Sequence, residues 1–437
     1  MYKIAFVTFG CKVNQYETEC MRALFLENGF AAAEKALSAD AVVINSCTVT
    51  ASGDSRTLTA LRKLRKVLPD AVIALTGCYP QANREEAEKL TEADIIIGTK
   101  DRSSIVGLVK ACLEKRSRVV NISDYSADDV FEPLRCTKFD NNTRAFVKIQ
   151  DGCNQFCSYC MIPFARGRCR SKPMDLLYDE VKAIAAGGVK EIVLSGINLA
   201  FYGREFDRDL ADAVELCANT KGVERIRLGS LEPEMMSGAL LRRLAAVPQF
   251  CPQFHLSLQS GCEKTLRNMN RKYTAAEYLA LTEHIRGIFP ECSFTTDVMV
   301  GFPQETEEDH RESVDFVKKT GFSKVHVFRF SRRSGTKADK MDGQIADSVK
   351  SQRWQEMTAA AEETREGYLR SLVGRTVPVL FERENSTEFH HGYAPDYTLI
   401  KIYRKFPEKS LRNQIRSVII EEYGHDCCFG SLVTDAY

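Results

Sequence analysis

Cys153, Cys157 and Cys160 have a spacing that could bind an iron–sulfur cluster. They follow a C-x3-C-x2-C pattern directly after Ala145–Ile149, an apolar run that favours a β-strand. A 4Fe–4S cluster normally takes four thiolate ligands, so three leave one iron open, and an open metal position can bind a substrate or cofactor. Zinc is the alternative, because C-x2-C pairs are common in zinc sites and Cys169 could add a fourth ligand. No second spaced pair follows, so we favour a cluster for these three cysteines, the loop triad.

Cys11, Cys47 and Cys78, the strand-end triad, each follow an apolar run that is typical of a strand. Helical patterns separate these runs, and a fourth run lies at Ile95–Gly98, so an open parallel α/β sheet is predicted. Ligand sites of such sheets lie outside the carboxyl ends of the strands, where the three thiols would converge. Any one of them could simply be a small buried residue, but three at equivalent strand ends favour a second cluster site. The runs are 4–9, 41–45 and 71–76, and the helical patterns are 17–28, 54–68 and 84–90.

Four segments are similar to the radical S-adenosylmethionine (SAM) methylthiotransferases, the family that inserts sulfur and a methyl group into tRNA or a ribosomal protein. They are Thr8–Asn14, Val43–Thr50, Leu75–Gln81 and Gln150–Cys160, which contains the loop triad. The resemblance implies three cofactors, namely SAM and two 4Fe–4S clusters. The loop triad would hold the cluster whose open iron chelates SAM and whose electron cleaves it to a radical. The strand-end triad would hold an auxiliary cluster that handles the sulfur, which makes all six cysteines catalytic.

The middle of the chain also alternates strands with helices. Six apolar runs follow one another, at 145–149, 191–196, 225–229, 253–258, 293–301 and 325–330. A full TIM barrel needs eight such units over about 250 residues. Six units fit the central partial (β/α)6 barrel that the radical SAM resemblance implies, so the fold class is α/β.

Residues at the turns and strand ends of this barrel are the candidates for binding SAM. The glycines at Gly187, Gly188 and Gly301 could let the backbone approach the cofactor because they lack a Cβ. Ser257 and Gln259 belong to a segment similar to one near the cofactor in the family, and Glu232 could face the cavity. Ordinary turn chemistry or a satisfied buried polar group is the alternative for each. At Gln304 the family usually has glycine, so this sequence departs from the family pattern there.

Basic residues near the barrel loops and in the tail are the candidates for contacting RNA. They are Arg166, Arg168, Arg332, Arg333, Lys405 and Arg412. Such side chains would bind phosphates without reading the base sequence, and a solvated charged face is the alternative. The last two lie in a tail of short β segments, at 377–382, 398–403, 417–422 and 428–433, which predict a small C-terminal β-barrel. The tail resembles the TRAM domain that ends tRNA-acting members of the family.

The length and composition of the chain are typical of a globular protein with several domains. We expect a methylthiotransferase domain at 1–115, a linker at 116–138, a radical SAM domain at 139–371 and a TRAM-like RNA-binding domain at 372–437. The sequence contains no run of about 18 apolar residues, so we expect no membrane span. The sixteen cysteines indicate metal or redox chemistry in a reducing compartment, so we expect a cytoplasmic protein. The net charge of +1 does not by itself indicate a nucleic-acid partner.

The resemblance therefore predicts an enzyme that methylthiolates carbon 2 of an adenine next to the anticodon of tRNA. The run Phe146–Cys157 and the stretch at 392–397 look most like the branch that acts on N6-threonylcarbamoyladenosine. The branches for isopentenyladenosine and for a ribosomal-protein aspartate are the alternatives. A non-catalytic iron–sulfur RNA-binding protein is the alternative from another class. A flavodoxin- or ferredoxin-like protein would supply electrons, and the oligomeric state is left open.

Overall fold

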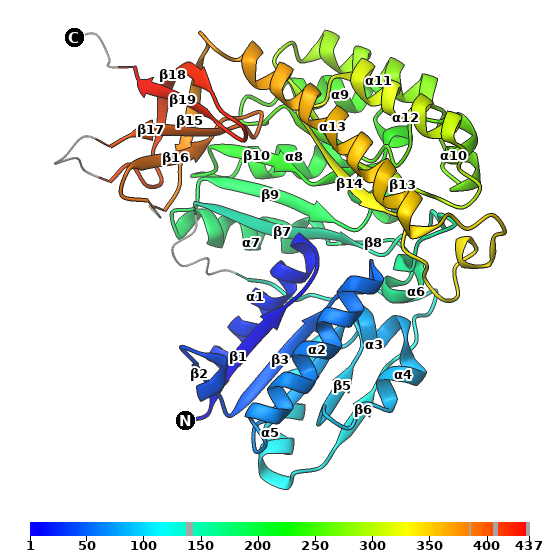
Figure 1. The fold of residues 1–437 in the computed structure, drawn as a ribbon. Coiled ribbons are helices and arrows are strands. Elements are labelled where there is room, and N and C mark those ends of the chain that lie inside the picture. The colour runs from blue at the N-terminus through cyan, green and yellow to red at the C-terminus, as the bar shows by residue number, and fades with distance from the viewer. Residues whose placement is uncertain (137–142, 384–385, 405–409, 434–437) are drawn as a thin grey trace.

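The computed structural model describes residues 1–136, 143–383, 386–404 and 410–433. Figure 1 shows the blue N-terminal domain beneath the green and yellow central domain, with the red C-terminal barrel at one side. The fold is α/β, with parallel sheets in the first two domains and a closed five-stranded barrel in the third, as the sequence predicts. No helix of the described residues is long and apolar enough to cross a membrane.

The N-terminal domain is a six-stranded parallel sheet in the order β2-β1-β3-β4-β5-β6. Its central strands β3 and β4 are buried along their whole length, which fits their nearly continuous apolar sequence and helices on both faces. The strands are β1 (Lys3–Thr8), β2 (Ala31–Ala32), β3 (Ala41–Ser46), β4 (Val72–Gly77), β5 (Ile95–Ile97) and β6 (Val119–Asn121). The helices are α1 (Lys12–Glu27), α2 (Ala51–Val67), α3 (Cys78–Ala82), α4 (Arg84–Glu88) and α5 (Ile105–Lys115).

The first domain does not end where the sequence suggested. Strand β6 pairs in parallel with β5, so the sheet continues past the expected boundary at residue 115. The described part of the expected linker is also not a loose tether, because Leu134 and Cys136 are buried against Tyr16 and Cys20 of α1. The short edge strands β2 and β6 were not predicted, since two or three residues carry too little periodicity.

All six predicted strands of the central domain form and run parallel. They are β7 (Arg144–Asp151), β9 (Glu191–Gly196), β10 (Arg225–Leu228), β12 (Gln253–Leu256), β13 (Ser293–Val300) and β14 (Lys324–Arg329). They pair as two sheets, β10-β9-β7-β8 and β11-β12-β13-β14, which include the short strands β8 (Arg170–Ser171) and β11 (Ser230–Leu231). Strand β8 is antiparallel to β7. A bridge between Ile226 and Phe250 lies beside β10.

Helices connect the strands and cover the outside of this domain (Figure 1). Three of them begin with a capping box, at Asp209, Thr274 and Thr306, which fixes where each helix starts. The helices are α6 (Ile162–Arg166), α7 (Met174–Ala186), α8 (Leu210–Ala218), α9 (Gly238–Ala245), α10 (Glu263–Asn268), α11 (Ala275–Ile288) and α12 (Glu307–Thr320).

The long helix α13 (Asp347–Ser371) leads from the central domain into the C-terminal barrel. The barrel closes in the order β15-β16-β17-β19-β18. Its core contains Val379, Ile400 and Val418, together with Leu369 of α13. The strands are β15 (Thr376–Phe381), β16 (Phe389–Tyr393), β17 (Leu399–Tyr403), β18 (Ile415–Tyr423) and β19 (Cys428–Leu432).

Candidate active site

Residues of all three domains line a cavity of about 790 Å³. Residues of β12, β13 and β14 form one wall, the start of α1 at Cys11–Val13 forms another, and the loop 393–399 of the C-terminal domain also contributes. The size lies within the range of about 300–1,000 Å³ that encloses small molecules. Polar side chains of Gln253, His255 and His326 face this space.

The strand-end triad lies at one edge of the N-terminal sheet. Cys11, Cys47 and Cys78 follow β1, β3 and β4, which are adjacent strands. Gly10 has a φ of +106°, and a Cβ there would lie 2.8 Å from Cβ of Cys47 and 3.1 Å from its Sγ. Only glycine therefore lets the Cys11 loop approach Cys47 this closely.

Asn14 holds the ends of two of these strands together. Its Nδ2 donates to the carbonyl oxygens of Phe9 and Ser46, each at 2.8 Å. In return, Nδ2 of Asn45 donates to the carbonyl of Asn14 at 2.9 Å. The loop that carries Cys11 is thus fixed to the strand end that carries Cys47.

The loop triad is held by the turn after β7. Gly152 has a φ of +74°, and a Cβ would lie 1.9 Å from the carbonyl oxygen of Arg168. The amide of Cys153 donates to the carbonyl of Gly167 at 3.0 Å, and that of Cys160 donates to Cys157 at 3.0 Å. These contacts fold the loop back on itself between Cys153 and the end of α6.

The thiols of the loop triad receive hydrogen bonds from neighbouring side chains. Nδ2 of Asn198 donates to Sγ of Cys153 at 3.5 Å. The guanidinium of Arg271 donates to Sγ of Cys157 at 3.2 Å and pairs with the carboxylate of Glu232. Burial raises the pKa of Cys153 and of Cys160 to about 12, so binding a metal there must displace protons.

Neither triad has the geometry of a single-ion site. Tetrahedral zinc with Zn–S bonds of about 2.3 Å brings its sulfurs within about 4 Å of one another. In the described part of the chain, only Cys262, Asp309 and Glu312 offer His, Cys or carboxylate atoms within 4.8 Å of one another. Cys169 does not complete a zinc site either, because its Sγ donates to the carbonyl of Gly152 at 3.7 Å. The wider spacing of both triads fits a cluster with several irons.

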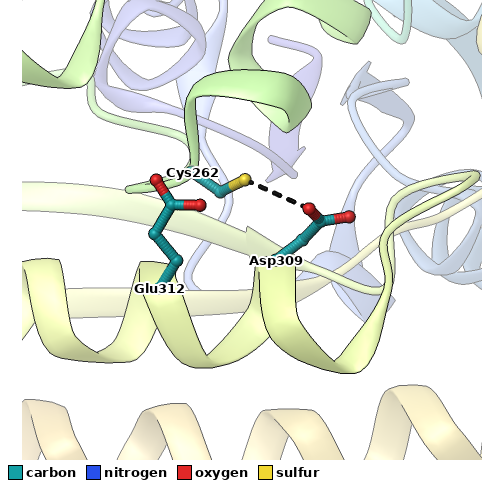
Figure 2. A group of neighbouring side chains, drawn as sticks. All are labelled: Cys262, Asp309 and Glu312. Carbon is teal, nitrogen blue, oxygen red and sulfur yellow. Dashed lines mark hydrogen bonds between the residues drawn. The ribbon is translucent and has the colours of Figure 1, made fainter.

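Figure 2 shows that Cys262 and Asp309 point toward one another beside Glu312. Sγ of Cys262 donates to Asp309 at 3.5 Å. The same carboxylate accepts from the amide of Thr306 and pairs with Lys264, each at 2.7 Å. Asp309 therefore serves the capping box at the start of α12, and this group of three side chains stabilises the local fold.

Arg166 links the two triads and is completely buried. Its Nε donates to Sγ of Cys78 at 3.3 Å, and its terminal nitrogens donate to Oδ1 of Asn14 at 2.7 Å and to Glu17. It also lies 3.5 Å from the carboxylate of Asp151, two residues before the loop triad. The prediction that Arg166 binds RNA is therefore wrong, since no part of it reaches the surface.

Glu17 is the centre of this buried ionic network. It is fully buried and pairs with Arg102, Arg166 and Lys148. Burial alone would raise the pKa of Glu17, but the three cations together hold it well below its usual range. The network joins α1 of the first domain to β7 and α6 of the second.

The other predicted RNA contacts occupy different environments. Arg168 is exposed, and Arg332 is exposed and pairs with Asp339. Arg333 is buried and donates to Asp54 at 2.6 Å and to Thr48 at 2.7 Å, so it joins two domains and is not available to RNA. Arg412 is half-buried. Lys405 lies outside the described residues.

The predicted SAM contacts divide into two groups. Ser257, Gln259, Gly301 and Glu232 lie at or beyond the carboxyl ends of strands, on the side of the loop triad. The Ser257 carbonyl accepts from Arg271, and Gln259 pairs with β13 through its amide and carbonyl. Arg271, which contacts Cys157, was not among the predicted site residues.

Gly187 and Gly188 are placed far from the loop triad. They end α7 and precede β9, so they lie at the amino end of a strand whose carboxyl end approaches Cys153. The carbonyl of Gly188 instead accepts from Asn413 of the C-terminal domain at 2.8 Å. The prediction that these glycines bind SAM does not agree with this position.

Lys12 was not predicted to have a role. It is adjacent to Cys11 and lines the cavity. Burial, with help from the nearby charges of Arg227 and Arg144, lowers the pKa of Lys12 to about 8. The side chain is nevertheless accessible, because it projects into the cavity.

Comparisons with known proteins agree with this architecture. Residues 147–317 match the radical SAM superfamily, and residues 3–98 match an uncharacterized protein family, UPF0004. A threonylcarbamoyladenosine tRNA methylthiotransferase, MtaB of Bacillus subtilis (strain 168), is 34% identical over 427 residues, which are 96% of this chain and 94% of the relative. A tRNA-2-methylthio-N(6)-dimethylallyladenosine synthase of Caldicellulosiruptor saccharolyticus is 33% identical, over 86% of this chain and 81% of the relative. The radical SAM methyltransferase TsrM of Kitasatospora setae shares the fold, with a TM-score of 0.56 and 15% identity over 77% of each chain.

Proposed function

The chain belongs to the radical SAM tRNA methylthiotransferases, and on that premise we propose that its substrate is N6-threonylcarbamoyladenosine next to the anticodon. The enzyme class and the use of SAM with 4Fe–4S clusters follow from the family. The choice among modified adenosines does not, because relatives named for both bases match at 34% and 33% identity.

The lining of the cavity is the observation that carries this proposal. Lys12, Gln253, His255 and His326 present polar groups to the space between the domains. A threonylcarbamoyl group carries a carboxylate, a hydroxyl and a urea, which can bond such groups. Gln253 and His255 already hydrogen-bond to Thr295 of the neighbouring strand. An isopentenyl group would offer no hydrogen-bond partner to Lys12 or His326. A site that hydrogen-bonds a polar substituent rejects an apolar analogue strongly, whereas an apolar site rejects a polar analogue only weakly.

The loop triad would hold the cluster that supplies the electron for reductive cleavage of SAM. Around it, the side chains of this chain set geometry and exclude water. Arg271 and Asn198 donate to two of the three sulfurs, and Glu232 and Tyr273 hold Arg271 in place. The strand-end triad would hold the auxiliary cluster, beside the buried Arg166.

The target base must leave its stack to reach an enclosed cavity, which single-stranded loops permit. Phe156 and Phe164 are half exposed on the segment that carries the loop triad, with ring centroids 6.4 Å apart. Arg168 is exposed on the same segment. Aromatic rings and a cation together suit stacking on bases and contact with phosphate, and we infer that this segment meets the anticodon loop.

The test is turnover by the anaerobically reconstituted protein with SAM and a reductant. Separate reactions receive tRNA carrying threonylcarbamoyladenosine, isopentenyladenosine or unmodified adenosine, and the nucleosides are analysed by mass spectrometry. The proposal expects methylthiolation of the first. Product from the isopentenyl tRNA alone would assign the chain to that branch. Absence of 5′-deoxyadenosine in all reactions would favour a non-catalytic RNA-binding protein.

The natural electron source is expected to be a flavodoxin- or ferredoxin-like protein in the cytoplasm, where tRNA is modified. Replacing the chemical reductant by each protein in the same assay identifies the donor.

A further inference from the structure

The loop 394–398 of the C-terminal domain closes the floor of the cavity at the amino ends of the central strands. Arg225 donates to the carbonyl oxygens of Tyr393 and Pro378, and Arg227 donates to that of Pro395, all at 2.7–2.8 Å. Ser293 Oγ donates to the carbonyl of Asp396 at 2.7 Å. The floor is therefore a fixed surface.

This floor carries more positive than negative charge. Its cations are Lys12, Arg144, Arg225 and Arg227, and its carboxylates are Glu191, Glu382 and Asp396, the last on the loop itself. Arg144 pairs with Glu382, and Arg227 pairs with Glu191 at 3.1 Å. The three carboxylates thus leave one positive charge in excess on this floor.

Arg225 also lies 3.9 Å from Glu191, so Lys12 is the one of these four cations that has no ion pair with a described residue. Within the described ranges it makes no hydrogen bond or ion pair, and its Nζ lies 5.4 Å from the ring centre of Phe146 and 5.6 Å from that of Tyr397. The ammonium group is accessible from the cavity and has no anion of the described chain in contact with it. The position therefore suits an anion that arrives from the cavity.

We propose that Lys12 binds the carboxylate of the substituent on the substrate's adenine and so determines which modified base the enzyme accepts. This inference rests on the proposed function. The neighbouring Arg144 and Arg227 add positive potential, and the hydroxyl of Tyr397, which accepts from Arg144 at 2.7 Å, keeps its proton for donation to the same anion. A base with an apolar substituent brings no anion and leaves Lys12 unpaired.

The proximity of Lys12 to Cys11 offers a different role, in which the lysine serves the auxiliary cluster. The ammonium group, however, reaches β7 and the floor loop. The cation that contacts the strand-end triad is Arg166, at 3.3 Å from Sγ of Cys78. Lys12 therefore faces the substrate side of the cavity.

The experiment compares ligands that differ only in this charge. An anticodon stem-loop is prepared with threonylcarbamoyladenosine, with its methyl ester, or with unmodified adenosine, and its binding to the reconstituted holoenzyme is measured at one salt concentration. Charge-assisted hydrogen bonds contribute about 1.5–3 kcal/mol, so the wild type should bind the acid about 10- to 100-fold more tightly than the ester. Lys12→Gln and Lys12→Met should lose most of this preference, and Lys12→Arg should restore part of it. Lys63→Gln, on the exposed face of α2, is the control for loss of one positive charge.

The outcomes separate this inference from the proposed function. If the wild type prefers the acid and the Lys12 variants keep that preference, the inference fails and the proposed substrate stands. If the wild type binds acid and ester equally yet methylthiolates the threonylcarbamoyl base, the inference fails again. If it modifies only the isopentenyl base, the proposed function fails. Loss of iron from the Lys12 variants, together with normal discrimination in what remains folded, would assign the lysine to the cluster instead.

Discussion

The two cysteine triads are connected through Arg166 but are positioned by different means. The loop triad lies on one continuous loop, so its spacing along the chain carries the information. The strand-end triad is assembled from three strands, and only the sheet brings its members together. Each triad has one buried arginine within hydrogen-bond distance of one sulfur, Arg271 for Cys157 and Arg166 for Cys78.

The two arginines differ in what holds them. Arg271 is fixed within its own domain by Glu232 and Tyr273. Arg166 comes from the segment of the loop triad, crosses to the other domain and is fixed there by Glu17 and Asn14. The strand-end triad therefore depends on the contact between domains, whereas the loop triad does not.

Substituting single cysteines gives the largest expected effects. Cys153→Ala should reduce SAM cleavage to background, because the remaining thiols cannot retain the cluster. Cys47→Ala should leave SAM cleavage intact and stop methylthio insertion. Both variants are assayed for 5′-deoxyadenosine and for modified nucleoside, after iron and sulfide analysis. Equal loss of both activities in Cys47→Ala would show that the triads do not work separately.

Glu17 holds Arg166 and Glu232 holds Arg271, and removing the first carboxylate should destabilise the protein more than removing the second. Glu17→Gln leaves three buried cations with too little negative charge and should cost about 3–5 kcal/mol. Glu232→Gln, at a site that is partly accessible, should cost about 1–3 kcal/mol. Denaturant unfolding of the two variants measures the difference. A larger loss in Glu232→Gln would contradict the comparison.

The same network predicts a dependence of stability on pH. The pKa of folded Glu17 is held well below its ordinary value of 4.5 by the surrounding cations. Its contribution to stability is therefore complete above about pH 4.5 and is lost as the pH falls through the folded pKa. In acid titrations of unfolding free energy, the wild type should show a steeper decline below pH 4.5 than Glu17→Gln. Parallel curves would mean that Glu17 does not carry this charge.

The smallest effect is expected at Arg168, two residues after Arg166 along the chain. Arg168→Ala should weaken tRNA binding only a few-fold and lower the slope of log affinity against log salt by about 1. Iron content and SAM cleavage without tRNA should not change. Lys63→Ala serves as the control for charge. If Arg168→Ala instead lost the auxiliary cluster, the division between buried Arg166 and exposed Arg168 would be incorrect.

These two arginines also show what the sequence could and could not predict. The strands before Cys11, Cys47, Cys78 and Cys153 were predicted, because apolar runs and helical patterns alternate clearly. Arg166 and Arg168 lie in the same basic stretch, and the sequence does not show which one is buried. Arg166 is buried because Glu17 of the N-terminal domain pairs with it. The sequence around an arginine does not show which residue of another domain will pair with it.

The prediction that Gly187 and Gly188 bind SAM was wrong for a related reason. A glycine pair is equally compatible with either end of a strand, and here it precedes β9. Lys12 was missed because a single lysine after a cysteine carries no pattern. Its role depends on the floor built by residues nearly four hundred positions later in the chain.

That floor makes the C-terminal domain difficult to exchange. A module whose only task is to hold RNA could be replaced by another RNA-binding module joined to Ser371. Here the barrel strands supply the carbonyl oxygens of Tyr393 and Pro378 to Arg225. The loop 394–398 supplies that of Pro395 to Arg227, and its Tyr397 lines the cavity. A chimera with a foreign barrel would open the reaction chamber to water from below, even if it bound tRNA well. Grafting experiments should therefore transfer the barrel together with the amino ends of β7, β9 and β10.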